Sequence, residues 1–228
     1  LTGENSRKRS QNNAAKFKAS KAEELSGSRY GLGSEGSFGP DPFVGLTAWA
    51  HEVLVWWDAL EQREVVAFTQ GAATNYDQCT ITTWEQAREF AIEVGFPSHG
   101  VIVGKPGQIG FAKDCVDWQA LEHQVGIALN AGPLWLETDM RAHRNPTRMT
   151  MIARCAEELS RLLQCACPSC ERPGFGDVSP ITGAVCESCG AVTAAVRAKK
   201  TSCNACGYSE EVDVQATVPA ARCERCNP

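Results

Sequence analysis

Four C-x-x-C pairs in the last third of the chain constrain its fold more than any other feature. Fifteen residues separate the first two pairs and sixteen separate the last two. Two thiolates in one tight turn can face a single cation, and two such turns complete the tetrahedral four-thiolate shell that zinc prefers. The spacing therefore predicts two structural zinc sites, with these ligands: Cys167, Cys170, Cys186, Cys189, Cys203, Cys206, Cys223 and Cys226.

Two other uses of these cysteines are open, and so is the order in which the pairs combine. A disulfide framework is one alternative, but the sequence has no secretory signal, and clustered cysteines in a reducing compartment are typically ligands. A thioredoxin-like redox motif is the other, although no βαβ pattern precedes the pairs. We expect the first pair to join the second and the third to join the fourth, because this order closes shorter loops than a cross-braced order.

The segment 165–228 that carries the pairs contains few large apolar residues. It cannot fold on apolar burial alone, so bound metal would supply the missing stabilisation. Gly190 and Gly207 directly follow the second cysteine of a pair, where a metal-binding knuckle requires a positive φ. We therefore expect a domain of two consecutive zinc ribbons over residues 165–228.

Residues 1–164 show the pattern of an α/β domain, in which a mixed sheet is flanked by helices. The glycine-rich stretch 30–42 is typical of a functional turn. A hairpin is expected over 51–71, a second hairpin over 101–113 and a single strand over 133–138. Apolar periodicity and capping residues predict helices over 11–25, 84–94, 117–130 and 147–164.

The stretch ETDMRAHRNPTRM, residues 137–149, places an unusual density of charge between a predicted strand and a predicted helix. Asn145 is the expected N-cap and Pro146 the first helical residue. Arginines beside a helix N-terminus suit phosphate or carboxylate, so we predict an anion site with these members: Asp139, Arg141, His143, Arg144 and Arg148. The alternative is a purely structural turn in which Asp139 pairs with an arginine.

Charge and hydropathy exclude several classes of protein. Residues 1–29 hold seven Lys/Arg against three Asp/Glu, residues 30–164 hold nine against seventeen, and residues 165–228 hold six against seven. A nucleic-acid binder would show a basic domain or stripe, and only residues 1–29 lean that way. No uninterrupted apolar run is long enough for a membrane span. With no signal peptide either, we expect a cytoplasmic protein.

The motifs GSEGSFGP, GFPSHG, ETDMRAHRNPTRM, the CPSC knuckle and the terminal CNP resemble those of an uncharacterised bacterial family known only as a domain of unknown function. The likeness spans essentially the whole chain. It implies no activity. It also implies that family members begin with a further segment containing a strand and a loop, which this sequence lacks.

A remoter resemblance links NNAAKFKASKA, GLGSEGSFG and AHRNPTRMTMI to the non-canonical purine nucleoside triphosphate pyrophosphatases, the inosine and xanthosine triphosphatases. The resemblance implies that Lys18 contacts phosphate, that Glu35 is the metal-associated acid, and that His143 and Arg144 contact the base. Glu35 stands where those enzymes often have two adjacent aspartates, and their N-terminal phosphate loop has no counterpart in this sequence.

Two hypotheses about function follow. In the first, the chain is a Mg²⁺-dependent hydrolase of a nucleotide or another phosphorylated small molecule, with Glu35 and Lys18 as catalytic residues and the arginines neutralising developing charge. In the second, it is a non-catalytic zinc-ribbon protein that binds a protein partner, and the charged turn is an internal clamp. Convergence of Glu35, Lys18 and Arg144 in one cleft would favour the hydrolase.

Overall fold

The computed structural model describes residues 10–228, which divide into two compact units with the boundary between Leu159 and Ser160. The first unit combines helices with two small antiparallel sheets, and the second holds the cysteine pairs. The long α-helices are α1 (Gln11–Ser26), α2 (Trp84–Glu93), α3 (Trp118–Leu129) and α4 (Pro146–Gln164). The predicted combination of helices and sheets followed by two ribbon-like knuckle pairs is confirmed, although the strands form separate sheets.

The first sheet is an antiparallel meander of β1 (Tyr30–Pro40), β2 (Ala48–Asp58) and β3 (Arg63–Gly71). The hairpin predicted over 51–71 is β2 with β3. The prediction of a turn over 30–42 is wrong, because most of that stretch is strand β1, paired with β2 from Tyr30 to Pro40.

The glycines of β1 serve a close helix approach. A β-carbon on Gly31 would lie 1.9 Å from the carbonyl oxygen of Ala19, and one on Gly33 would lie 2.2 Å from that of Ala15. Both alanines on α1 are fully buried. The glycines therefore let the backbone of α1 lie directly on the strand. Ser10 caps this helix by accepting a hydrogen bond from the N–H of Asn13.

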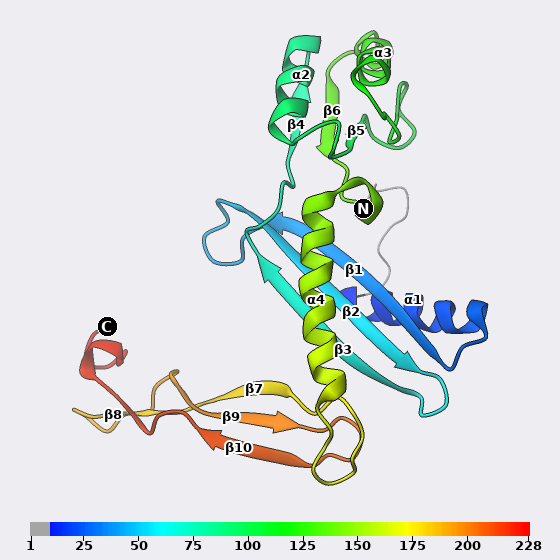
Figure 1. The fold of residues 1–228 in the computed structure, drawn as a ribbon. Coiled ribbons are helices and arrows are strands. Elements are labelled where there is room, and N and C mark those ends of the chain that lie inside the picture. Colours follow the sequence, from blue (N-terminus) through cyan, green and yellow to red (C-terminus); the bar gives the residue numbers. More distant parts are fainter. Residues whose placement is uncertain (1–9) are drawn as a thin grey trace. The chain divides into compact units, whose positions relative to one another are not determined.

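The two faces of this sheet are covered by different helices, α1 on one and α4 on the other (Figure 1). Neighbouring residues of a strand point to opposite faces. Glu35 contacts Lys18 of α1, whereas a β-carbon on the next residue, Gly36, would lie 2.9 Å from Nη2 of Arg148 on α4. Side chains at odd positions of β1 thus face α1, and those at even positions face α4.

A second antiparallel sheet has the order β4 (Gln78–Ile81), β6 (Leu134–Thr138), β5 (Val101–Val103). The strand predicted over 133–138 is β6. In place of a second regular hairpin over 101–113, β5 pairs with β6, and only Val103 bridges back to Ala112. A fully buried core joins this sheet to α2 and α3, with Ala87, Ala91, Leu121, Val125 and Leu136 among its members.

The cysteine unit contains a three-stranded antiparallel sheet in the order β10 (Ser209–Asp213), β9 (Val196–Ser202), β7 (Asp177–Thr182). A short parallel pair, β8 (Val185–Cys186) with β11 (Thr217–Val218), completes it. Buried apolar residues other than cysteine are few in this unit: Leu162, Ala184, Ala198 and Val218. Of the helices within residues 10–228, none combines the length and the apolar character needed to cross a membrane.

Candidate functional site

The eight cysteines of the C-x-x-C pairs gather into two groups of four. One group holds Cys167, Cys170, Cys203 and Cys206, and the other holds Cys186, Cys189, Cys223 and Cys226. Within each group all four Sγ atoms lie within 4.8 Å of one another. The candidate ligand sets are therefore interleaved, first pair with third and second with fourth. The expected sequential order is wrong.

The sheet of the cysteine unit explains this interleaving. Asp177 at the start of β7 pairs with Ser202 at the end of β9, so the knuckle before β7 lies beside the knuckle after β9. The second knuckle follows β7 at the other end of these strands. There, the parallel pairing of β8 with β11 brings the fourth knuckle to it. Strand pairing, rather than the length of the closed loop, decides which cysteines meet.

The sulfur separations match a four-thiolate metal site. The Sγ–Sγ distance is 3.7 Å for Cys167 with Cys206 and 3.8 Å for Cys170 with Cys203. In the second group, two of these distances are 3.8 Å. A zinc–sulfur bond of about 2.3 Å in a tetrahedron places its sulfurs about 3.8 Å apart. A disulfide would require about 2.0 Å, and all eight cysteines are free.

The knuckles share a backbone turn that aims both thiols inward. The residue after the second cysteine donates its N–H to the carbonyl of the first, at 2.8 Å for Glu171 and 2.9 Å for both Gly190 and Gly207. The two glycines have φ of 69° and 77°, as the sequence predicted. Glu171 takes the same left-handed conformation, at φ 59°, without the freedom of a glycine.

The backbone of the second knuckle also favours the thiolate form of its first cysteine, Cys186. Backbone N–H groups of Cys189 and Ser188 hydrogen-bond to the sulfur of Cys186 and lower the pKa of its thiol to about 7. Metals bind the thiolate and not the thiol. The turn that positions the sulfur therefore also prepares it to bind a cation at neutral pH.

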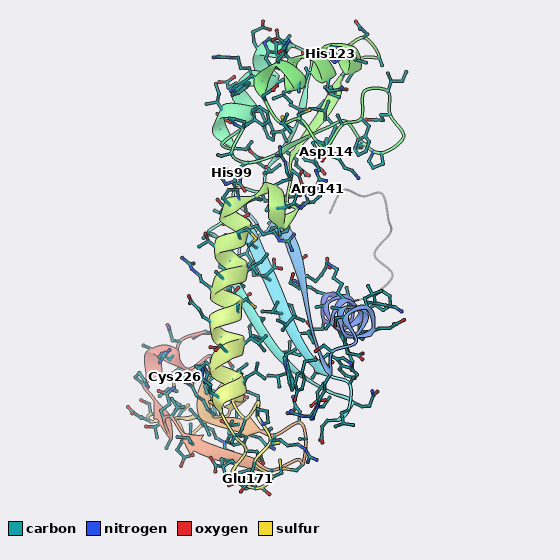
Figure 2. All side chains as sticks on the ribbon, turned by 45° about the vertical axis from the view of Figure 1, so that its right-hand side comes forward. His99, Asp114, His123, Arg141, Glu171 and Cys226 are labelled. Atoms are coloured by element: carbon teal, nitrogen blue, oxygen red, sulfur yellow. The ribbon has the colours of Figure 1, made fainter. Side chains whose placement is uncertain are left out.

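The charged turn after β6 is built almost entirely from internal contacts. Arg141 donates from Nε and Nη2 to the carboxylate of the fully buried Asp139, at 2.7 to 3.0 Å. Its Nη2 also reaches Oδ1 of Asp114 at 2.9 Å, and Figure 2 shows these two residues side by side. The carboxylates raise the pKa of Arg141, and Arg141 lowers that of Asp114.

The start of α4 is fixed by the same turn. Oδ1 of Asn145 accepts the N–H of Arg148 at 2.9 Å, which confirms the predicted N-cap, and Pro146 is the first helical residue. Arg148 donates from Nε and Nη2 to the carboxylate of Glu52, and from Nη1 to the carbonyl of Met140 at 2.6 Å. Residues 142–144 form the short 3-10 helix η1 (Ala142–Arg144).

The remaining members of the predicted anion site divide between internal contact and solvent. Arg144 donates from Nη2 to the carbonyl of Cys115 at 2.7 Å, and His143 is exposed. Anion binding by this turn stays a prediction. The observed contacts fit the alternative of an internal clamp, because Arg141 and Arg148 already hold carboxylates.

The two predicted catalytic residues do meet. Nζ of Lys18 lies 2.6 Å from Oε2 of Glu35 and 3.0 Å from the carbonyl oxygen of Ser34. The pair lies on the α1 face of the first sheet, whereas Arg148 lies on its α4 face. Arg144 holds the loop at Cys115, beside the second sheet. The structure thus joins Glu35 to Lys18 without joining them to the arginines in one cleft.

Sequence reasoning missed two partners of the charged turn, Glu52 and Asp114. Glu52 is only 1% exposed, although it occurs in the apolar strand sequence HEVLVWW. A signal was available in the sequence, because Glu52 is a single acid at an inward position of an apolar strand. Buried charges are usually paired, so this position predicts a basic partner. Asp114 lies in an irregular loop, and no sequence pattern distinguished it.

Residues 18–228 match the model of the family described as Domain of unknown function (DUF6671). The chain belongs to this family. Neither a curated protein nor a solved structure matched it.

Proposed function

We propose that the chain is a non-catalytic zinc protein in which two structural ions fold residues 160–228 into a unit that binds a protein partner. The observation that carries this proposal is the geometry of the two cysteine groups. In each group, two Sγ–Sγ distances between cysteines of different C-x-x-C pairs are 3.7 or 3.8 Å. Soft thiolate ligands in tetrahedral arrangement select zinc or iron, and zinc is the choice for a structural role.

The metal in such a site would have no chemistry to perform on a substrate. Four protein thiolates fill the tetrahedral shell, so no position is left for a water nucleophile. The ions would act on stability instead, because only a few apolar side chains other than cysteine are buried in this unit. The proposal includes a cytoplasmic location, because thiolate sites persist in a reducing compartment.

A protein partner suits the surface of this unit better than a nucleic acid. Residues 165–228 hold six Lys/Arg against seven Asp/Glu, which gives no basic stripe for phosphates. Strand β10 lies at an edge of its sheet and every one of its residues is exposed. An edge strand presents unpaired backbone groups on which an extended segment of another protein can pair.

A metal-exchange experiment tests this proposal. The full chain is purified, its zinc is measured by elemental analysis, and the metal is then removed with a chelator and restored. We expect two zinc ions per chain, and eight additional reactive thiols after removal. We also expect a partner, isolated with the zinc-loaded chain and then purified, to bind the loaded form and not the stripped form. Equal binding by both forms would contradict the proposal.

A second candidate function, a Mg²⁺-dependent hydrolase of phosphorylated small molecules, is favoured by one observation. Glu35 is 13% exposed at its side chain and holds Lys18 at 2.6 Å, so an acid and a phosphate-binding cation are adjacent. A panel of nucleoside triphosphates with Mg²⁺, assayed against the wild type and Glu35→Gln, tests it. Phosphate release by the wild type that Glu35→Gln abolishes would favour the hydrolase. Equal release by both would remove Glu35 from the mechanism.

A further inference from the structure

The loop that joins β1 to β2 exposes three large apolar side chains within four positions. Phe43 is 78% exposed, Val44 is 71% exposed and Leu46 is 85% exposed. These three residues are here called the apolar tip. Isolated exposed apolar residues are common on protein surfaces, but a group of them at the end of a hairpin marks a surface used for contact.

The backbone of this loop is held by a single buried carboxylate, that of Asp41. Oδ1 accepts the N–H groups of Phe43 at 3.0 Å and Val44 at 2.8 Å. Oδ2 accepts those of Leu46 at 2.8 Å and Thr47 at 3.0 Å. These hydrogen bonds hold the pKa of Asp41 well below its usual range. The loop thus satisfies its own amides around the carboxylate and turns its apolar side chains outward.

This arrangement is preorganised for binding. The ring of Phe43 also packs edge-on against Trp49, with centroids 5.8 Å apart. A loop that is already ordered loses less conformational entropy when it docks. Aromatic and aliphatic anchors that enter a pocket carry much of the binding energy at protein interfaces.

The charge around the apolar tip indicates what it contacts. Between Glu35 and Glu52, the only Asp, Glu, Lys or Arg is Asp41, and its carboxylate is turned into the loop. Asp77 and Glu93 lie near Ala48 at the base of the loop, and not among the three exposed side chains. The part of a partner that meets these three side chains is therefore apolar and uncharged. Attachment to an anionic bilayer usually requires a basic patch beside the apolar group, and residues 36–51 contain no lysine or arginine.

A second copy of the chain fits the apolar tip poorly. A stable interface buries about 800 Å² on each partner. Three side chains meeting the same three side chains of another copy fall well short of that area. A cleft that surrounds the loop would bury these side chains together with the flanking backbone.

We propose that the apolar tip inserts into an uncharged, apolar cleft on a different protein. The tip lies in the unit that ends at Leu159, whereas both cysteine groups lie in the other unit. This contact is therefore distinct from the one proposed for the zinc-bound unit, and it does not depend on that proposal.

Site-specific photo-crosslinking identifies the partner. The full chain carries p-benzoylphenylalanine at position 43, or at Leu25 as a control, and is expressed in the cells it comes from. Leu25 is 85% exposed near the end of α1. The protein captured from position 43 and not from position 25 is purified, and its affinity is measured by calorimetry.

We expect Phe43→Ser and Leu46→Ser each to weaken the affinity at least ten-fold, and Leu25→Ser to change it less than two-fold. The thermal midpoints of Leu46→Ser and Leu25→Ser should match the wild type, since both side chains are exposed. The midpoint of Phe43→Ser should fall only slightly, because that variant also loses the edge-on contact with Trp49. The proposal is overturned if no protein is captured specifically from position 43, or if the captured protein is the chain itself. It is also overturned if Phe43→Ser binds the captured protein as well as the wild type does. If the wild type sediments with phosphatidylcholine vesicles and Phe43→Ser does not, the proposal is also overturned and the tip is assigned to a membrane.

Discussion

Arg148 and Glu52, 96 positions apart in the chain, form a two-pronged ion pair that fastens α4 to the first sheet. Nε and Nη2 of Arg148 lie 3.1 and 3.0 Å from the two carboxylate oxygens of Glu52. Their side chains are 6% and 1% exposed. Breaking such a pair leaves one charge buried without a counter-charge, which costs more than the pair itself contributes.

Replacing Glu52 by glutamine should therefore destabilise the protein strongly. We expect Glu52→Gln to lower the free energy of unfolding by about 3–5 kcal/mol, measured by urea denaturation of the full chain. Glu24→Gln is the matched control, because Glu24 pairs with Lys21 at the surface and the two side chains are 62% and 47% exposed. The control should lose about 1 kcal/mol at most. Similar losses for both variants would contradict the buried clamp.

The close approach of α1 to β1 gives a second prediction. We expect Gly33→Ala to destabilise the protein by at least about 2 kcal/mol, because the added methyl group would lie 2.2 Å from a helix carbonyl oxygen. Gly39→Ala in the same strand has open space at the added atom and should change stability by less than about 1 kcal/mol. Thermal unfolding of both variants measures the difference. Equal midpoints would show that α1 does not rest on β1 as described.

The first knuckle should gain stability from a glycine. Glu171 is an exposed residue at φ 59°, and this conformation costs a non-glycine residue about 1–2 kcal/mol. We expect Glu171→Gly to hold metal more tightly and Gly207→Ala, at φ 77°, to hold it less tightly, each by roughly 1 kcal/mol. Competition with a chelator measures both affinities. A weaker site in Glu171→Gly would contradict the assigned turn.

Asp41 predicts a particular response to acid. The backbone N–H groups of Thr47, Val44, Phe43 and Leu46 depress the folded-state pKa of Asp41. The ionised carboxylate therefore stabilises the fold at pH values above its unfolded-state pKa of about 3.9, and this stabilisation is lost as the pH falls below that value. Asp41→Asn should be less stable than the wild type at pH 7, and the difference should shrink as the pH falls from 5 to 3. Urea midpoints across this range measure it. A constant difference would contradict the prediction.

A structural feature could be predicted from the sequence when residues close to it in the chain determine it. The eight clustered cysteines and the N-cap Asn145 were predictable, because a knuckle or a helix start is specified within a few residues. The combination of knuckles was not. That combination depends on the pairing of β7 with β9 and of β8 with β11. These pairings bring together cysteines that are far apart in the sequence; Cys167 and Cys206, for example, are 39 positions apart.

The glycine-rich stretch 30–42 shows the same limit. Glycine is a turn signal when only the local chain is considered, yet Gly31 and Gly33 lie in a strand because α1 needs their missing side chains. The arginines of residues 141–148 were expected to receive an anion, and their carboxylate partners Glu52 and Asp114 were not apparent from the local sequence. Tertiary contacts decided where these glycines lie and which carboxylates pair with the arginines, whereas anion binding by the turn stays a prediction.

Cadmium NMR tests the central claim, the two interleaved thiolate sites, most directly. The full chain is loaded with ¹¹³Cd, and scalar coupling from each metal to the cysteine β-protons identifies its four ligands. We predict two cadmium signals, one coupled to Cys167, Cys170, Cys203 and Cys206 and the other to Cys186, Cys189, Cys223 and Cys226. A signal coupled to Cys167, Cys170, Cys186 and Cys189, or a chain that binds fewer than two ions, would contradict the account.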